Sequence, residues 1–74
     1  MFRSLFRDTQ EKVAARINRH GDRYRNAHDH AAEEEARAAA DLARNAPTVE
    51  EAREVERDFY GRYRGPTPRS RDDS

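Results

Sequence analysis

Three histidines lie close together in the chain, at His20, His28 and His30, and are the first candidates for metal or acid–base chemistry. Histidine pairs that share a metal ion on a helix usually stand four residues apart, because this spacing places both rings on one face. His28 and His30 stand two residues apart, and on a helix they would point about 200° away from each other. We therefore predict surface histidines near a helix start and no metal site.

Three consecutive glutamates, at positions 33–35, are the next candidates, as general acids or cation ligands. Catalytic carboxylates need a desolvated cleft that shifts their pKa values, whereas three successive helical side chains point in three directions. The chain has no cysteine, no phosphate-binding glycine loop and no serine nucleophile in a strand–turn–helix setting. We predict a solvated acidic face, and a protein that is not an enzyme, has no catalytic residues and carries no cofactor.

Charge is sorted along the chain, although the formal net charge is zero. Residues 1–26 carry seven basic and three acidic side chains, and residues 27–58 carry four basic and ten acidic ones. Residues 59–74 carry four arginines against two aspartates. Such a chain can fold basic segments onto acidic ones, pair with its own copies, or present each segment to a different partner.

A basic stripe runs along one flank of the predicted first helix. Together with arginines near the C-terminus it forms the candidate nucleic-acid contacts, which are Lys12, Arg16, Arg19, Arg23, Arg62 and Arg64. Cations at helical spacing can follow a phosphate backbone, and tyrosines interleaved with arginine suit stacking on single-stranded bases. The neutral total charge and the acidic middle segment oppose this interpretation, because the same arginines can pair with the chain's own glutamates. Nucleic-acid binding is therefore the alternative prediction.

An apolar face forms the candidate surface for a protein partner. Its members are Phe2, Leu5, Phe6, Val13, Ile17 and Tyr24. Part of this set recurs at the spacing of one helical face, and such a face can lie in an apolar groove of a partner or of a second copy. Flanking arginines and glutamates would then set orientation and association rate more than affinity. We expect the segment 1–7 to pack as an apolar cap on its own bundle or on that of a partner.

The elements that must position these residues are helices, because the first 60 residues show no strand-like alternation. We predict helices over about 9–20, 29–45 and 48–60. The N-terminal caps expected for them are Asp8 with Glu11, Asp29, and Thr48 with Glu51. Pro47 restricts the residue before it and marks the boundary between the last two helices.

The first boundary is less well defined. Gly21 follows a basic pair, as glycine often follows the last turn of a helix. However, Ala27, Ala31, Ala38 and Leu42 continue the apolar phase of the first helix. An interior glycine costs only about 1 kcal/mol relative to alanine, so one continuous helix over about 9–45 stays open. A break or kink at Gly21 is slightly favoured.

Large apolar side chains lie near both ends of the predicted helical region, and the segment between Arg25 and Asp41 offers only alanine. An alanine face cannot build a core alone, but it lets another helix approach closely. In a three-helix fold the bulky ends would meet across this helix. In a hairpin built on one long helix, the N-terminal apolar residues would stay uncovered and require a partner.

The sequence therefore predicts an all-α fold, either a helical hairpin or a small three-helix bundle. It predicts one domain over residues 1–61 and a basic, disordered tail over residues 62–74. The predicted function is non-catalytic protein–protein interaction, as a regulator, adaptor or accessory subunit that binds another protein or forms a homo-oligomer. No apolar run is long enough to span a membrane and no signal peptide is visible, which favours the cytoplasm.

Overall fold

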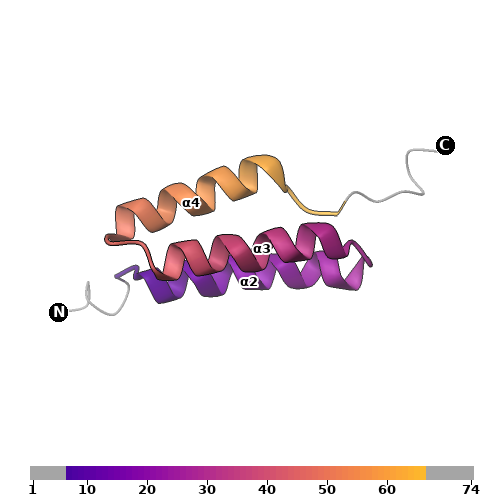
Figure 1. Cartoon of the computed structure of the whole chain (residues 1–74), viewed down its shortest axis with the longest axis horizontal. Coiled ribbons are helices and arrows are strands. Elements are labelled where there is room, and N and C mark those ends of the chain that lie inside the picture. The colour runs from indigo at the N-terminus through magenta and orange to yellow at the C-terminus, as the bar shows by residue number, and fades with distance from the viewer. Residues whose placement is uncertain (1–6, 67–74) are drawn as a thin grey trace.

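Three α-helices make up the part of the chain that the computed structural model describes, residues 7–66. They are α2 (Gln10–Asn26), α3 (His30–Arg44) and α4 (Val49–Arg62), and residues 7–66 contain no strand. The helices alternate in direction, with α2 and α3 as an antiparallel pair and α4 alongside it (Figure 1). The all-α prediction is confirmed, and the chain adopts the three-helix arrangement.

Each helix begins after a side-chain cap. The caps Thr9, Asp29 and Thr48 each accept a hydrogen bond from the backbone N–H three residues later, at 3.1 or 3.2 Å. Such caps satisfy backbone donors that have no partner within the helix. The second and third caps are the predicted ones. At the first helix the prediction of Asp8 is wrong by one position, because its carboxylate accepts the N–H of Thr9 and the hydroxyl of Thr9 caps the helix.

Gly21 does not end the first helix, so the predicted boundary near residue 20 is wrong. Helix α2 continues through Gly21 to Asn26. The chain then reverses at His28, whose φ of 63° lies in the left-handed region, and the N–H of Asp29 donates to the Tyr24 carbonyl at 2.8 Å. This turn also excludes the single helix over 9–45.

The glycine instead permits close contact between α2 and α3. A Cβ atom added at Gly21 would lie 2.6 Å from the Cβ of Ala36, a separation too short for two carbon atoms. Both residues are buried. The local pattern of a glycine after basic residues is therefore explained by packing between helices and not by a helix end.

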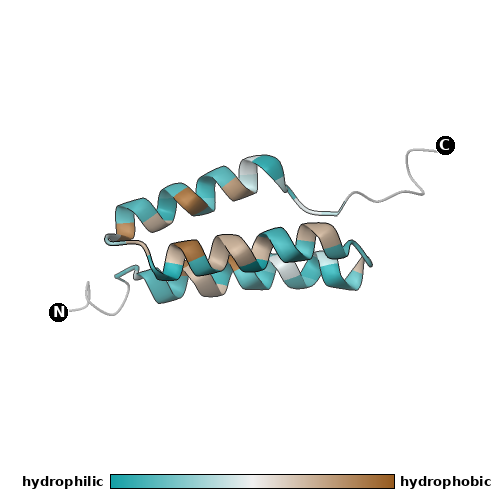
Figure 2. Ribbon diagram, in the orientation of Figure 1, coloured by the Kyte–Doolittle hydropathy of each residue, from teal (hydrophilic) through white to brown (hydrophobic). Residues whose placement is uncertain are grey.

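The core combines large side chains on α2 and α4 with small ones on α3. Val13, Ile17 and Phe59 are the largest fully buried side chains. They form one cluster with four of the alanines of α3, which are Ala36, Ala39, Ala40 and Ala43. Apolar and hydrophilic residues alternate around each helix, as expected for amphipathic helices (Figure 2). The expectation that bulky ends meet across an alanine helix is confirmed.

The chain continues to contact the bundle after α4, so the predicted tail boundary at residue 62 is too early. Arg62 is the last residue of α4. Beyond it, the Tyr63 carbonyl lies 2.7 Å from His20 Nε2, and the N–H of Gly65 donates to the Tyr24 hydroxyl at 2.6 Å. The rest of the predicted tail, residues 67–74, lies outside the described residues, as do residues 1–6.

Candidate functional site

Half of the predicted partner-binding face forms the protein's own core. Val13 and Ile17 are 0% exposed and Tyr24 is 5% exposed. Phe59 of α4 packs in the same cluster as Val13 and Ile17. A partner cannot reach these three residues while the fold is intact, so this part of the prediction is wrong. The other members, Phe2, Leu5 and Phe6, lie outside the described residues.

A groove between α3 and α4 offers a different surface. It has a volume of about 590 Å³ and lies beside the loop that joins the two helices. Its apolar lining consists of Leu42, Ala46, Pro47 and Val55, and its polar lining of Asn45, Glu51, Glu54 and Asp58. Within residues 7–66, Leu42 is the one exposed large hydrophobic side chain, at 64%. The groove is therefore lined by apolar side chains, here called its floor, and by carboxylates, here called its rim.

Leu42 is not among the predicted site residues, because its phase with the apolar positions of the first helix indicated a core position. On α3 the buried positions are alanines, and Leu42 lies at the edge of that alanine face. A large side chain would not fit where α2 approaches most closely. The signal that could have identified it is that Leu42 is the single large apolar residue of α3.

Arg16, one of the predicted nucleic-acid contacts, instead joins α2 to α4. Its guanidinium lies 3.0 Å from Asp8 Oδ2 and 2.8 Å from Glu56 Oε2. Hydrogen bonds to these carboxylates raise the pKa of Arg16, and its own hydrogen bonds lower the pKa values of Asp8 and Glu56. Arg53 also lies 3.0 Å from Asp8. Arg16 is thus neutralised within the fold.

The predicted contacts Arg62, Lys12 and Arg64 differ in their partners. Arg62 pairs with Asp58 at 3.1 Å, and Lys12 Nζ donates to the Arg7 carbonyl at 2.8 Å. Arg64 is exposed on the segment after α4. The basic stripe is therefore not a continuous row of free cations.

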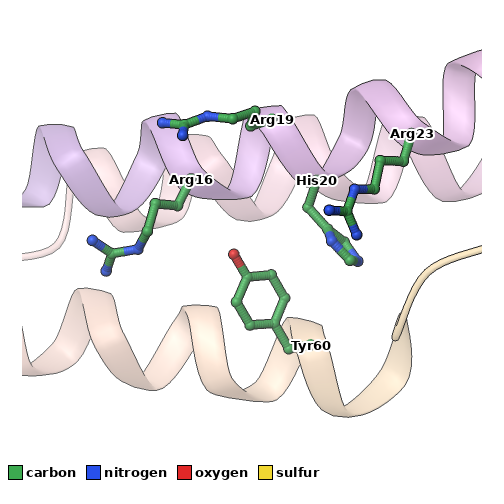
Figure 3. Close-up of a pocket in the computed structure, with 5 residues that line it drawn as sticks. All are labelled: Arg16, Arg19, His20, Arg23 and Tyr60. Carbon is green, nitrogen blue, oxygen red and sulfur yellow. The ribbon is translucent and has the colours of Figure 1, made fainter.

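Arg19 and Arg23 lie at a second, smaller pocket between α2 and α4, which has a volume of about 220 Å³. Both side chains are exposed, and within residues 7–66 neither has a carboxylate within 4.0 Å. In Figure 3, Arg23 and His20 point from α2 toward α4, and Tyr60 points from α4 toward α2. Burial and the nearby Glu56 carboxylate raise the pKa of Tyr60.

His20 is partly buried within the fold, whereas His28 and His30 are exposed. His20 Nε2–H donates to the Tyr63 carbonyl, because a carbonyl can only accept, and the ring packs edge-on against Tyr24 and Phe59. The rings of His28 and His30 lie 6.4 Å apart, between centroids. Within residues 7–66 no three histidine, aspartate or glutamate side chains are placed to hold a metal ion.

The three consecutive glutamates of α3 differ in their surroundings. Glu34 and Glu35 are exposed, whereas Glu33 lies 3.0 Å from Arg37, which also contacts Asp22 on α2 at 2.9 Å. Hydrogen bonds to His30 and Arg37 lower the pKa of Glu33. The carboxyl pKa values that shift in the described chain are all lowered, the opposite of what a general acid at neutral pH needs.

None of the helices within residues 7–66 is sufficiently long and apolar to cross a membrane. Comparisons of the chain with protein-family models, with curated proteins and with solved structures find no match.

Proposed function

We propose that this protein is a non-catalytic protein–protein interaction module that binds an apolar, basic-flanked protein segment in the α3–α4 groove. A regulator, an adaptor or an accessory subunit would act in this way. The observation that carries the proposal is Leu42, 64% exposed in a groove with carboxylates at its rim. A single exposed leucine is ordinary, but here it lines one groove together with Pro47 and Val55. The cytoplasmic location stays a prediction.

Floor and rim would have different roles in binding. Burial of a large apolar side chain contributes about 1.5–3 kcal/mol, so contact with Leu42 and Val55 would supply most of the affinity. Exposed ion pairs at the rim contribute about 0–1 kcal/mol each. Glu51 and Glu54 would therefore select basic flanks and increase the association rate, and would add little affinity.

Replacing Leu42 with glutamine is expected to weaken binding at the groove. The probe is a synthetic amphipathic helix of leucine and lysine, titrated into the ¹⁵N-labelled full chain and followed by NMR. The amides of Leu42, Ala46 and Val55 should shift in the wild type. Leu42→Gln should bind at least about tenfold more weakly, because it loses the apolar contact without a change in net charge.

Ala15→Gln provides the matched control, because Ala15 is exposed on α2, outside the groove. This variant should bind the peptide as the wild type does. Equal affinities of the wild type and Leu42→Gln, or peptide-induced shifts centred away from the groove, would contradict the proposed function.

Nucleic-acid association is the alternative, and the observation in its favour is the unpaired state of Arg19 and Arg23 among the described residues. Against it, two of the six predicted contacts, Arg16 and Arg62, pair with carboxylates of the chain itself. The alternative predicts that a single-stranded oligonucleotide is retained at about 50 mM salt, is released as salt rises, and is not retained by Arg19→Gln/Arg23→Gln. Absence of retention at low salt excludes it.

A further inference from the structure

We propose that the pocket between α2 and α4 binds the phosphate group of a small ligand, either inorganic phosphate or a small phosphate monoester. The residues that line this pocket are Arg16, Arg19, His20, Arg23 and Tyr60. The inference goes beyond the proposed function, because the pocket is a second surface of the molecule, separate from the α3–α4 groove.

The pocket and the groove lie on opposite sides of α4. At 100° per residue, Tyr60 points about 180° away from Glu51 and about 200° away from Asp58, which line the groove. Arg53 and Arg57 lie on the Tyr60 side of the helix, where they line a further pocket together with Tyr60. Helix α4 therefore carries groove carboxylates on one side and arginines on the other. An anion is attracted to the Tyr60 side.

A carboxylate also lies on this side, that of Glu56, but its charge is compensated within the fold. Arg16 pairs with Glu56 at 2.8 Å and with Asp8 at 3.0 Å, and Arg53 pairs with Asp8 at 3.0 Å. This cluster holds two arginines and two carboxylates, so it is neutral as a whole. Arg16 is therefore not counted among the cations available to a ligand.

Arg19 and Arg23 supply the available positive charge. They stand one turn apart on α2, are exposed, and have no carboxylate within 4.0 Å among residues 7–66. A phosphate monoester carries a charge of about −1.5 to −2 near pH 7, which matches two arginines. This balance favours a phosphate dianion over a singly charged carboxylate, and each arginine can donate two hydrogen bonds to phosphate oxygens.

Two aromatic side chains in contact with each other complete the lining. The rings of His20 and Tyr60 lie 4.9 Å apart, between centroids, and His20 is held by its hydrogen bond to the Tyr63 carbonyl. Arg23 and His20 point from α2 toward the Tyr60 ring on α4 (Figure 3). The volume of about 220 Å³ is below the range of about 300–1,000 Å³ that drug-sized ligands occupy. The ligand is therefore a phosphate group with at most a small organic substituent against the rings.

The test is a titration of the ¹⁵N-labelled full chain with sodium phosphate and with phenyl phosphate, followed by NMR at constant ionic strength. The amides of Arg19, His20, Arg23 and Tyr60 should shift and reach saturation with a phosphate ligand, and should not do so with sodium chloride. Tighter binding of phenyl phosphate than of inorganic phosphate would identify an organic monoester as the preferred ligand. Equal or weaker binding would identify inorganic phosphate.

Substitutions on α2 test the roles of the two arginines. Arg19→Gln/Arg23→Gln should weaken phosphate binding at least about tenfold, because charge-assisted hydrogen bonds are lost. Arg23→Gln and Arg25→Gln form a matched pair, since both arginines are exposed in the last turn of α2. Arg25 points about 200° away from Arg23 and does not line the pocket. Arg23→Gln should weaken binding, Arg25→Gln should leave it unchanged, and circular dichroism checks that each variant keeps its helices.

The inference would be overturned if neither phosphate ligand gives a saturable shift, or if Arg19→Gln/Arg23→Gln binds as the wild type does. Equal losses in Arg23→Gln and Arg25→Gln would also overturn it, because they would indicate attraction to overall charge. A single-stranded oligonucleotide that binds while neither phosphate ligand does would contradict the inference and support the nucleic-acid alternative. Binding of the leucine–lysine peptide at Leu42 is measured separately, so the proposed function can stand when this inference fails.

Discussion

Replacing Phe59 with alanine is expected to unfold most of the chain at room temperature. Phe59 is the largest fully buried side chain, with 1% of its surface exposed. Its ring lies 5.2 Å from that of Tyr63 and 5.6 Å from that of His20, between centroids. Phenylalanine-to-alanine changes in a core cost about 3–5 kcal/mol. A domain of this size rarely has more than about 3–5 kcal/mol of stability, so the loss matches the whole.

Urea unfolding followed by circular dichroism measures this effect. Phe59→Leu is the matched control, because it keeps most of the buried volume and should cost clearly less. Exposed Arg57 lies two residues away on α4, and Arg57→Ala should leave the unfolding midpoint nearly unchanged. A Phe59→Ala variant whose midpoint equals that of the wild type would show that α4 is not held by this core.

Replacing Gly21 with alanine is expected to destabilise the fold by about 1 kcal/mol, although alanine favours helices. The added Cβ would lie 2.6 Å from the Cβ of Ala36, an atom fixed by its own helix backbone. Overpacking of this kind typically costs about 1–3 kcal/mol, and the gain in helix propensity is about 1 kcal/mol. The destabilisation is expected because the new methyl group would push α2 and α3 apart at this contact. If Gly21 merely marked a helix end, the same change would stabilise the chain.

A second substitution tests this explanation directly. Ala36→Gly removes the methyl group that the new side chain would meet, so Gly21→Ala/Ala36→Gly moves one methyl group from α3 to α2. The double variant should be more stable than the sum of the two single changes predicts, by about 1 kcal/mol or more. Additive effects, measured by the same urea unfolding, would contradict a direct contact between the two positions.

Much of the fold could be predicted from the sequence because local chemistry determines it. Asp29 and Thr48 cap their helices as predicted, and Pro47 lies in the loop between α3 and α4. Gly21 was misinterpreted because a glycine after basic residues has the same local appearance at a helix end and at a close contact. Only the position of Ala36 in three dimensions distinguishes the two.

The candidate site was predicted less well, for a related reason. Periodicity identifies residues that share a helical face, but not whether that face is covered by the same chain or by a partner. Val13, Ile17 and Tyr24 are covered within the fold, whereas Leu42 is left exposed at the edge of the alanine face. Likewise, the pairing of Arg16 with Asp8 and Glu56 depends on tertiary structure that charge counting does not contain.

The measurement that tests the proposed interaction most directly is an isotope-filtered NOE experiment on the ¹³C-labelled full chain mixed with the unlabelled leucine–lysine peptide. Cross-peaks should connect methyl groups of Leu42 and Val55, which line the α3–α4 groove, with leucine side chains of the peptide. The Val55 cross-peaks should weaken with Leu42→Gln and persist with Ala15→Gln. Peptide cross-peaks confined to side chains outside the groove would contradict the account.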